Sequence, residues 1–140
     1  MAEISGGCIC GALTYKVNGE PLRMGQCHCK HCQRASGTGH MSLAFFKKED
    51  VKIEGDFTEY AAEADSGNHN IRAFCPTCGA RVFSRNSAND AVVGITAGCA
   101  DEHDWFEPQF IVYNKDKPAW DQMDSNVPAF EAMPPPKPAS

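Results

Sequence analysis

The sequence predicts a mainly β protein, a single domain of layered, short antiparallel sheets. Four observations favour this class. Short runs of alternating apolar and polar residues recur along the chain, which is the period of a half-buried strand. Turn-forming glycine, asparagine and proline residues separate these runs. No long amphipathic helical pattern is present, and cysteine pairs stand on the predicted turns as they do in zinc knuckles.

The strands are predicted, in chain order, at residues 13–17, 41–46, 51–53, 57–60, 81–84, 91–96 and 109–113. The first is the clearest, because Leu13, Tyr15 and Val17 alternate with polar residues and so define one buried face. The turn at Gly55-Asp56 predicts that the strands on either side of it form a hairpin. A short helical turn is expected at residues 33–37, closed by a glycine.

Length and proline content set the domain boundaries. A chain of 140 residues is of ordinary single-domain size. We assign residues 1–128 to one metal-binding domain and residues 129–140 to a proline-rich C-terminal tail. Proline lacks the backbone N–H that a sheet requires, so the tail is expected to be extended and solvated.

Composition excludes several classes of function. The formal charge of −5 and the pI near 5.5 argue against a non-specific nucleic-acid binder, which needs a basic face. Residues 1–7 contain neither the basic nor the apolar region of a secretory signal, and no apolar run reaches the length of a membrane span. We therefore expect a cytoplasmic protein with no membrane partner. In that compartment eight cysteines stay reduced, and their clustering favours metal binding over disulfides.

The segment 27–32, Cys-His-Cys-Lys-His-Cys, places three thiols and two imidazoles within six residues. Thiolates this close repel one another, and a cation between them is the simplest stabiliser. Zinc is the metal most often held by Cys and His ligands. Cys29 and Cys32 have the two-residue spacing of a zinc knuckle, and Cys27 lies one residue further out.

The remaining cysteines suggest a division into two zinc sites. Two Cys pairs, one near the N-terminus and one in a Cys-Pro-Thr-Cys-Gly turn, supply four thiolates for a closed structural site: Cys8, Cys10, Cys75 and Cys78. The trio Cys27, Cys29 and Cys32 supplies three ligands and leaves one position open, which is the pattern of a catalytic zinc. Cys99 stands alone and is expected to be a small, buried apolar residue.

Alternatives to this division remain open at the level of sequence. A histidine could complete the trio and give a second closed site; the candidates are His28, His31, His40 and His69. His28 and His31 are equally suited to a position outside the ligand shell. Arg34 is expected to be solvated rather than an anion clamp. Three aromatic residues are expected in the core or at a sheet edge, with a pocket as the alternative: Trp105, Phe106 and Trp120.

Three motifs in order, at residues 6–15, 27–37 and 74–80, resemble those of the glutathione-dependent formaldehyde-activating enzyme family. That family shares its domain with centromere protein V. The similarity extends to residues 117–120 and 127–131, so it covers most of the chain.

The resemblance implies a fold of the β-tent type with zinc sites at the ends of its sheets. It implies a structural zinc on the four-cysteine set and a catalytic zinc on the trio. The implied activity is that of a carbon–sulfur lyase resembling S-hydroxymethylglutathione synthase. Its substrates would be a small-molecule thiol, with glutathione as the co-substrate, and formaldehyde or a related electrophile.

A mechanism follows from an open zinc position. Zinc coordination deprotonates a thiol that is mostly neutral at pH 7, and His28 or His31 could carry the proton. Three thiolates weaken zinc as a Lewis acid, which favours activation of the thiol over polarisation of the aldehyde. Two other functions stay open: a non-catalytic, zinc-stabilised interaction module, and a lyase acting on a different thiol adduct.

Overall fold

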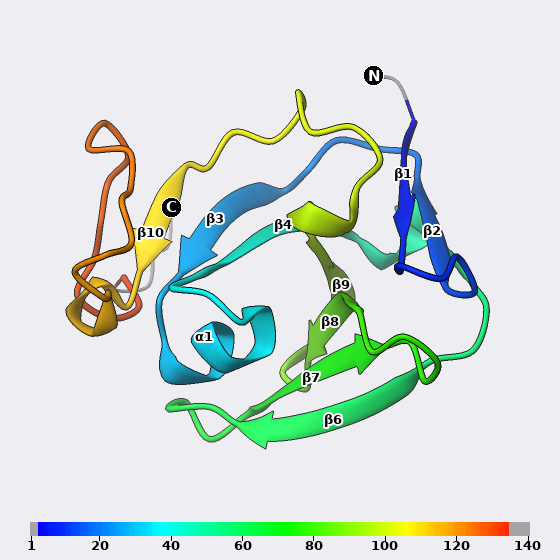
Figure 1. The fold of residues 1–140 in the computed structure, drawn as a ribbon, viewed down its shortest axis with the longest axis horizontal. Coiled ribbons are helices and arrows are strands. Elements are labelled where there is room, and N and C mark those ends of the chain that lie inside the picture. Colours follow the sequence, from blue (N-terminus) through cyan, green and yellow to red (C-terminus); the bar gives the residue numbers. More distant parts are fainter. Residues whose placement is uncertain (1–2, 135–140) are drawn as a thin grey trace. The chain divides into compact units, whose positions relative to one another are not determined.

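The computed structural model describes residues 3–134. Strands account for most of the regular structure, as the alternating pattern predicted (Figure 1). The strands are β1 (Ile4–Gly7), β2 (Thr14–Val17), β3 (Arg23–Cys27), β4 (Met41–Lys47), β5 (Val51–Glu54), β6 (Thr58–Glu63), β7 (His69–Phe74), β8 (Arg81–Asn86), β9 (Asn89–Thr96) and β10 (Phe110–Val112). The helical elements are α1 (Lys30–Ser36) and the 3-10 turns η1 (Lys48–Asp50), η2 (Ala97–Cys99) and η3 (Asn114–Asp116). Within residues 3–134, no helix has the length and apolar character that crossing a membrane requires.

The chain divides into two compact units. Among residues 3–134, the first contains residues 3–24 and the segment Leu43–Phe106, and the second contains Gly25–Ser42 and residues 107–134. The boundaries fall inside β3 and β4, so both strands contribute residues to each unit.

The first unit contains two antiparallel sheets. One pairs β1 with β2 and β2 with β5. The other runs in the order β4-β9-β8-β7-β6, in which β6 to β9 follow one another as a meander. Each meander connection is short, so strands that are neighbours in sequence are also neighbours in the sheet.

The core of this unit lies between its two sheets. One sheet contributes the buried face predicted from sequence, with Leu13, Tyr15 and Val17 at most 1% exposed. The other contributes apolar residues of β4, β7, β8 and β9, among them Phe46 and Ile95. Two aromatic residues predicted as core or edge cover, Trp105 and Phe106, pack against this cluster. Trp120, in the second unit, is 66% exposed, so its assignment to a core is wrong.

The predicted hairpin across Gly55 does not form. Instead β5 pairs with β2, and β6 pairs with β7. Gly55 has φ +103°, and a Cβ at this position would collide with the backbone carbonyl of Ala12. The chain therefore passes close against the β1–β2 loop before it enters the other sheet, and a residue other than glycine could not follow that path. The turn residues Gly55 and Asp56 could not reveal these partners, because the alternation of apolar and polar residues suits the predicted hairpin and the observed pairs equally well.

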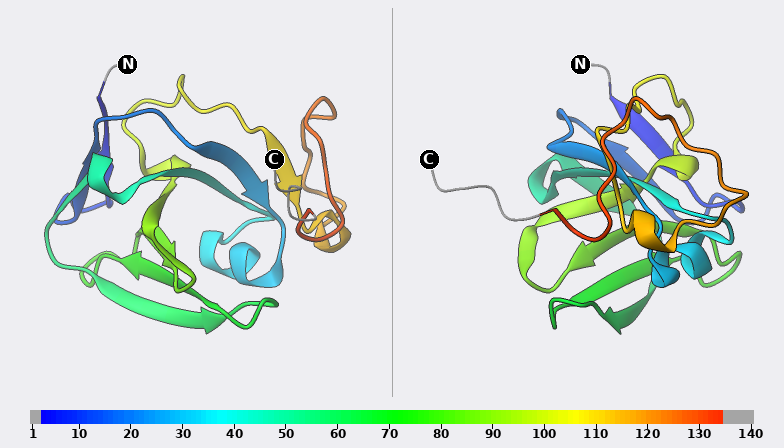
Figure 2. Two further views of the ribbon diagram at one scale, coloured as in Figure 1. Left: turned by 180° about the vertical axis from the view of Figure 1, so that it is seen from behind. Right: turned by 90° about the vertical axis from the view of Figure 1, so that its left-hand side faces the viewer.

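The second unit is built around the parallel pair of β3 and β10, which lie side by side in Figures 1 and 2. The register places Gly25 opposite Phe110 and Cys27 opposite Val112. Gly25 lies under the Phe110 ring, where any side chain would collide with it. The two strands run parallel, whereas the sequence predicted antiparallel sheets.

The segment following Pro128 hydrogen-bonds along β10. The Phe130 N–H donates to the Ile111 carbonyl at 2.8 Å, and the Asn114 N–H donates to the Phe130 carbonyl at 2.9 Å. The first residues of the predicted tail thus contact the folded chain. The part of the predicted tail from residue 135 on lies outside the described residues.

Candidate metal centres

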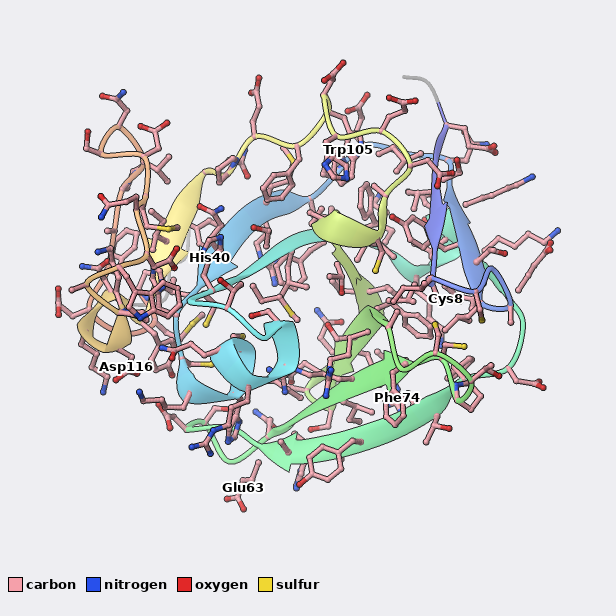
Figure 3. All side chains as sticks on the ribbon, in the orientation of Figure 1. Cys8, His40, Glu63, Phe74, Trp105 and Asp116 are labelled. Atoms are coloured by element: carbon pink, nitrogen blue, oxygen red, sulfur yellow. The ribbon has the colours of Figure 1, made fainter. Side chains whose placement is uncertain are left out.

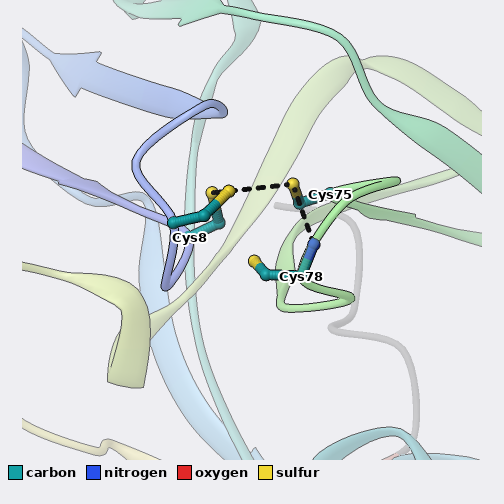
Figure 4. A group of neighbouring side chains, drawn as sticks. Cys8, Cys75 and Cys78 are labelled. Carbon is teal, nitrogen blue, oxygen red and sulfur yellow. Dashed lines mark hydrogen bonds between the residues drawn. The ribbon is translucent and has the colours of Figure 1, made fainter.

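Four cysteine sulfurs of the first unit converge, and we call them the first centre: Cys8, Cys10, Cys75 and Cys78. The first pair lies in the loop between β1 and β2, and the second lies in the turn between β7 and β8. Figure 4 shows Cys8 facing Cys75 and Cys78 from its own loop. The Sγ atom of Cys10 lies 3.7 Å from that of Cys8 and 3.6 Å from that of Cys75. Four thiolates around a tetrahedral zinc, each about 2.3 Å from the metal, are about 3.8 Å apart, so these sulfurs fit that ion.

Local backbone geometry directs these sulfurs. Gly11 and Gly79 adopt the left-handed conformation, with φ of 80° and 79°, and each closes one of the two cysteine loops. The Gly79 N–H donates to the Cys75 carbonyl at 2.8 Å, which completes a tight turn. Cβ-bearing residues adopt this conformation at a cost, which explains the glycine after each cysteine pair.

Backbone N–H groups point at the sulfurs of the first centre. The Leu13 N–H donates to Cys8 Sγ at 3.3 Å, and the N–H groups of Thr77 and Cys78 donate to Cys75 Sγ at 3.4 and 3.5 Å. Such donors favour the ionised form of a thiol. The donor set and its hydrogen bonds therefore fit a bound divalent cation.

Without a cation, the thiols of the first centre differ in how readily they ionise at neutral pH. The backbone N–H of Ala80 lowers the pKa of Cys78 to about 6. For Cys10, the Ala12 backbone lowers the pKa, but the neighbouring thiols of Cys75 and Cys8 outweigh this and raise it to about 11. One sulfur thus carries charge at neutral pH while its neighbour keeps a proton, and a metal ion that replaces the proton relieves the repulsion.

Three further sulfurs converge in the second unit, and we call them the second centre: Cys27, Cys29 and Cys32. Each occupies a different structural position, because Cys27 ends β3, Cys29 is the N-cap of α1 and Cys32 lies within α1. Their Sγ atoms all lie within 4.8 Å of one another. The Cys32 N–H donates to Cys29 Sγ at 3.3 Å, so the sulfur acts as the helix cap.

The helix of the second centre begins earlier than the sequence pattern suggested. The predicted turn at residues 33–37 is the end of α1, where Gly37 adopts φ +75° as the C-cap and its N–H donates to the Gln33 carbonyl. Cys29 caps α1 and Cys32 lies in its first turn. The two-residue spacing between these cysteines could therefore have indicated where the helix begins.

Among residues 3–134, no further Cys, His, Asp or Glu ligand atom joins the three sulfurs of the second centre. None of the four histidines that could have completed the set therefore does so in this structure. Two of them, His31 and His69, are exposed, as is Arg34. The side chains of Cys29 and Cys32, followed by burial, raise the pKa of the Cys27 thiol far above its ordinary value. A cation bound here would again replace a proton, and the described residues would offer it these three sulfurs as ligands.

A third group, which sequence reasoning missed, contains His28, His40 and Asp121. His40 precedes β4 and is labelled in Figure 3, and Asp121 lies 81 residues further along the chain. His28 is completely buried, and Asp121 is 8% exposed. Neither the burial of Asp121 nor its contact with His40, 81 residues away, can be read from a sequence, so no sequence signal pointed to this group.

Cys99 belongs to neither centre. Its thiol donates a hydrogen bond to the Arg81 carbonyl at 3.3 Å, and burial raises its pKa above the ordinary thiol value. We expect Cys99→Ala to keep the metal content of the wild type and to cost about 1 kcal/mol of stability, the value of one lost hydrogen bond. Metal analysis and thermal melting test this, and loss of a metal equivalent in Cys99→Ala would contradict the ligand assignment.

The chain is similar to known proteins in sequence and in fold. Residues 3–116 match the model of a family described as glutathione-dependent formaldehyde-activating enzyme. An uncharacterized lyase of Schizosaccharomyces pombe is 28% identical over 83 residues, which cover 59% of this chain and 58% of that protein. The match thus spans little more than half the length of this relative. A crystal structure of a Rhodobacter sphaeroides protein superposes with a TM-score of 0.55 at 23% identity, over 69% of this chain and 87% of that one, and supports the fold alone.

The family match covers most of the chain and includes all seven cysteines of the two centres. It confirms the resemblance predicted from the three cysteine motifs. The protein belongs to the glutathione-dependent formaldehyde-activating enzyme family.

Proposed function

We propose that the protein is a zinc-dependent carbon–sulfur lyase that joins a small-molecule thiol to a small aldehyde. Glutathione and formaldehyde are the substrate pair that the family suggests. The observation that carries the proposal is the second centre, where three sulfurs converge and no fourth protein ligand joins them among the described residues. The name of the Schizosaccharomyces pombe relative, a lyase, agrees with this class of reaction.

We infer different roles for the two centres, one structural and one catalytic. The first centre joins a loop near the N-terminus to a turn 65 residues later, which is the task of a structural ion. The second centre draws its ligands from one short segment and adds little cross-linking, so stability alone does not account for it. We assign a structural zinc to the first centre and a catalytic zinc to the second.

The proposed reaction forms one carbon–sulfur bond. The thiol sulfur attacks the aldehyde carbon, the π electron pair of the carbonyl moves to oxygen, and the thiol proton ends on that oxygen. The product is a thiohemiacetal, and no oxidant or reductant is consumed. Zinc, when bound, supplies the increased acidity that a free thiol of pKa about 8.5 lacks at neutral pH.

The chain itself contributes positioning. The hydrogen bonds from the N–H groups of Cys29 and Cys32 to Cys27 Sγ and Cys29 Sγ, at 3.5 and 3.3 Å, hold two ligand sulfurs at fixed positions. The Gln33 side chain donates to the His28 carbonyl at 2.7 Å and to the Asp116 carbonyl at 2.9 Å, which ties the ligand segment to η3. A preorganised ligand set of this kind reduces the entropy lost when substrates bind.

The test combines metal content with catalysis. We expect two zinc ions per chain, and we expect the zinc-loaded protein to accelerate the exchange between formaldehyde and S-hydroxymethylglutathione. Exchange spectroscopy by nuclear magnetic resonance measures this rate with and without protein, and chelator-treated protein is the control. Unchanged exchange with two zinc ions bound would reject glutathione and formaldehyde as the substrates, and the same assay with other thiols would then test the lyase class.

A further inference from the structure

The strand β6 forms an open edge of its sheet. It pairs with β7 on one side, and among the described residues no strand pairs with its other side (Figure 1). Every residue of β6 except Ala62 is exposed. The strand contains neither proline nor lysine, and its register with β7 has no bulge. Natural proteins protect exposed edges with such features, because free backbone groups pair readily with another strand.

The other sheet edges in the described part of the chain are covered or short. Beside β1, the Asp101 N–H donates to the Ser5 carbonyl at 2.9 Å, and beside β10, the Phe130 N–H donates to the Ile111 carbonyl at 2.8 Å. The edge strand β5 has four residues, and two of them are charged. The longer β6 therefore differs from these edges in leaving its backbone open.

Hydrogen bonds of the β6–β7 hairpin show which backbone groups of β6 are free. The Ala64 N–H donates to the Asn68 carbonyl at 2.8 Å, so these two residues form a hydrogen-bonded pair of the antiparallel ladder. Such pairs alternate along a strand, and the residues of β6 that direct their N–H and carbonyl groups toward β7 are Thr58, Tyr60 and Ala62. The residues that direct these groups outward are Glu59, Ala61 and Glu63.

The far side of β7 confirms this alternation. There the Ser87 N–H donates to the His69 carbonyl at 2.9 Å, so His69 faces β8, and its neighbour Asn70 faces β6. Asn70 is the partner of Ala62 in the register of β6 with β7. Ala62 thus faces β7, as the hairpin also requires.

The charges on β6 select one way in which two copies of it can pair. Two antiparallel copies related by a twofold axis hydrogen-bond when their outward-facing residues oppose each other. An axis at Ala61 would place Glu59 opposite Glu63 of the second copy, and an axis at Glu59 would oppose two copies of Glu59. Like charges directly opposite each other are destabilising. An axis at Tyr60 instead opposes Glu59 with Ala61, and axes nearer the ends of β6 pair fewer residues.

We propose that the chain forms a twofold-symmetric dimer in which the β6 strands of two copies pair antiparallel, with Tyr60 at the axis. The backbone groups of Glu59 then bond those of Ala61 in the second copy, and reciprocally. Tyr60, 67% exposed in the single chain, meets its counterpart as a cross-strand aromatic pair. Glu59 brings no uncompensated charge, because Arg85 donates two hydrogen bonds to its carboxylate at 2.9 and 3.2 Å.

Sedimentation of the full chain at a series of concentrations tests the proposal. A single strand pair makes a small interface, so we expect chiefly monomer at about 1 μM and chiefly dimer at about 100 μM. Ala61→Pro removes an outward N–H and no bond to β7, and it acts twice in the dimer, so it should weaken dimerisation roughly 10-fold or more. Ala61→Ser keeps the N–H and should dimerise as the wild type does.

Circular dichroism confirms that both variants retain the fold. A wild type that stays monomeric at about 100 μM overturns the proposal. Dimerisation of folded Ala61→Pro with the wild-type dissociation constant also overturns it, because the interface would then lie elsewhere.

Tyr60→Cys tests the position of the axis and does not depend on the proline variant. Opposite Cα atoms in a non-hydrogen-bonded antiparallel pair are about 4.5 Å apart, within the range that a disulfide spans. Oxidised glutathione should therefore join two Tyr60→Cys chains through position 60, which peptide mass spectrometry identifies. In the control Glu63→Cys, the two substituted positions would be about 20 Å apart, so no link through position 63 is expected.

A dimer that is not linked through position 60, or that is linked through position 63, overturns the proposed pairing. The pairing involves neither cysteine centre, so a monomeric protein would leave the lyase proposal unaffected.

Discussion

Cys75→Ser is expected to unfold or aggregate the protein. The Cys75 side chain is fully buried in the core of the first unit, and its sulfur lies 3.6 Å from that of Cys10. A closed four-thiolate zinc contributes on the order of 10 kcal/mol to a small zinc domain. That is comparable with the whole stability of a typical domain, about 5–15 kcal/mol, so loss of one ligand removes most of the margin. Cys8→Ser should behave in the same way.

Cys99→Ser is the control for this prediction, since it makes the same chemical change at a thiol outside both centres. Soluble yield, thermal melting and metal content compare the variants with the wild type. A soluble Cys75→Ser protein that melts at the wild-type temperature would show that the first centre is not needed for folding.

Cys29→Ser should abolish the proposed catalysis and leave the fold largely intact. The three sulfurs of the second centre come from six residues of one segment, so their metal cross-links few distant parts of the chain. Serine is also a good N-cap, and its hydroxyl can accept the Cys32 N–H that Cys29 Sγ accepts now. The substitution therefore removes a metal ligand while it preserves the start of α1.

Zinc content, thermal melting and the exchange rate together test this variant. We expect roughly one zinc fewer per chain, a small change in melting temperature and no acceleration above the uncatalysed rate. Cys29→Ala, which removes the helix cap as well, separates the two roles and should cost about 1 kcal/mol more than Cys29→Ser. Unfolding of Cys29→Ser as severe as that of Cys75→Ser would identify the second centre as structural.

The sequence alone determined the features that depend on near neighbours. Alternation identified the buried face of residues 13–17, and the strands at 41–46, 81–84 and 91–96 lie where predicted. The cysteine spacing also predicted the two groups of sulfurs that the structure brings together. The two cysteines of a chelating pair lie within a few residues of each other, so the local sequence sets their geometry. A tetrahedral zinc takes four ligands, so one cysteine pair predicts that a second pair completes the site.

Tertiary structure decided which strands pair and which distant side chains meet. The strands β5 and β6 have suitable alternation for a hairpin with each other, yet they pair with β2 and β7, because the close approach at Gly55 directs the chain into another sheet. The network of His28, His40 and Asp121 likewise depends on a contact between residues 81 positions apart. Periodicity carries no information about register or burial over such separations. The contacts among these three buried or half-buried side chains therefore became visible only in the folded chain.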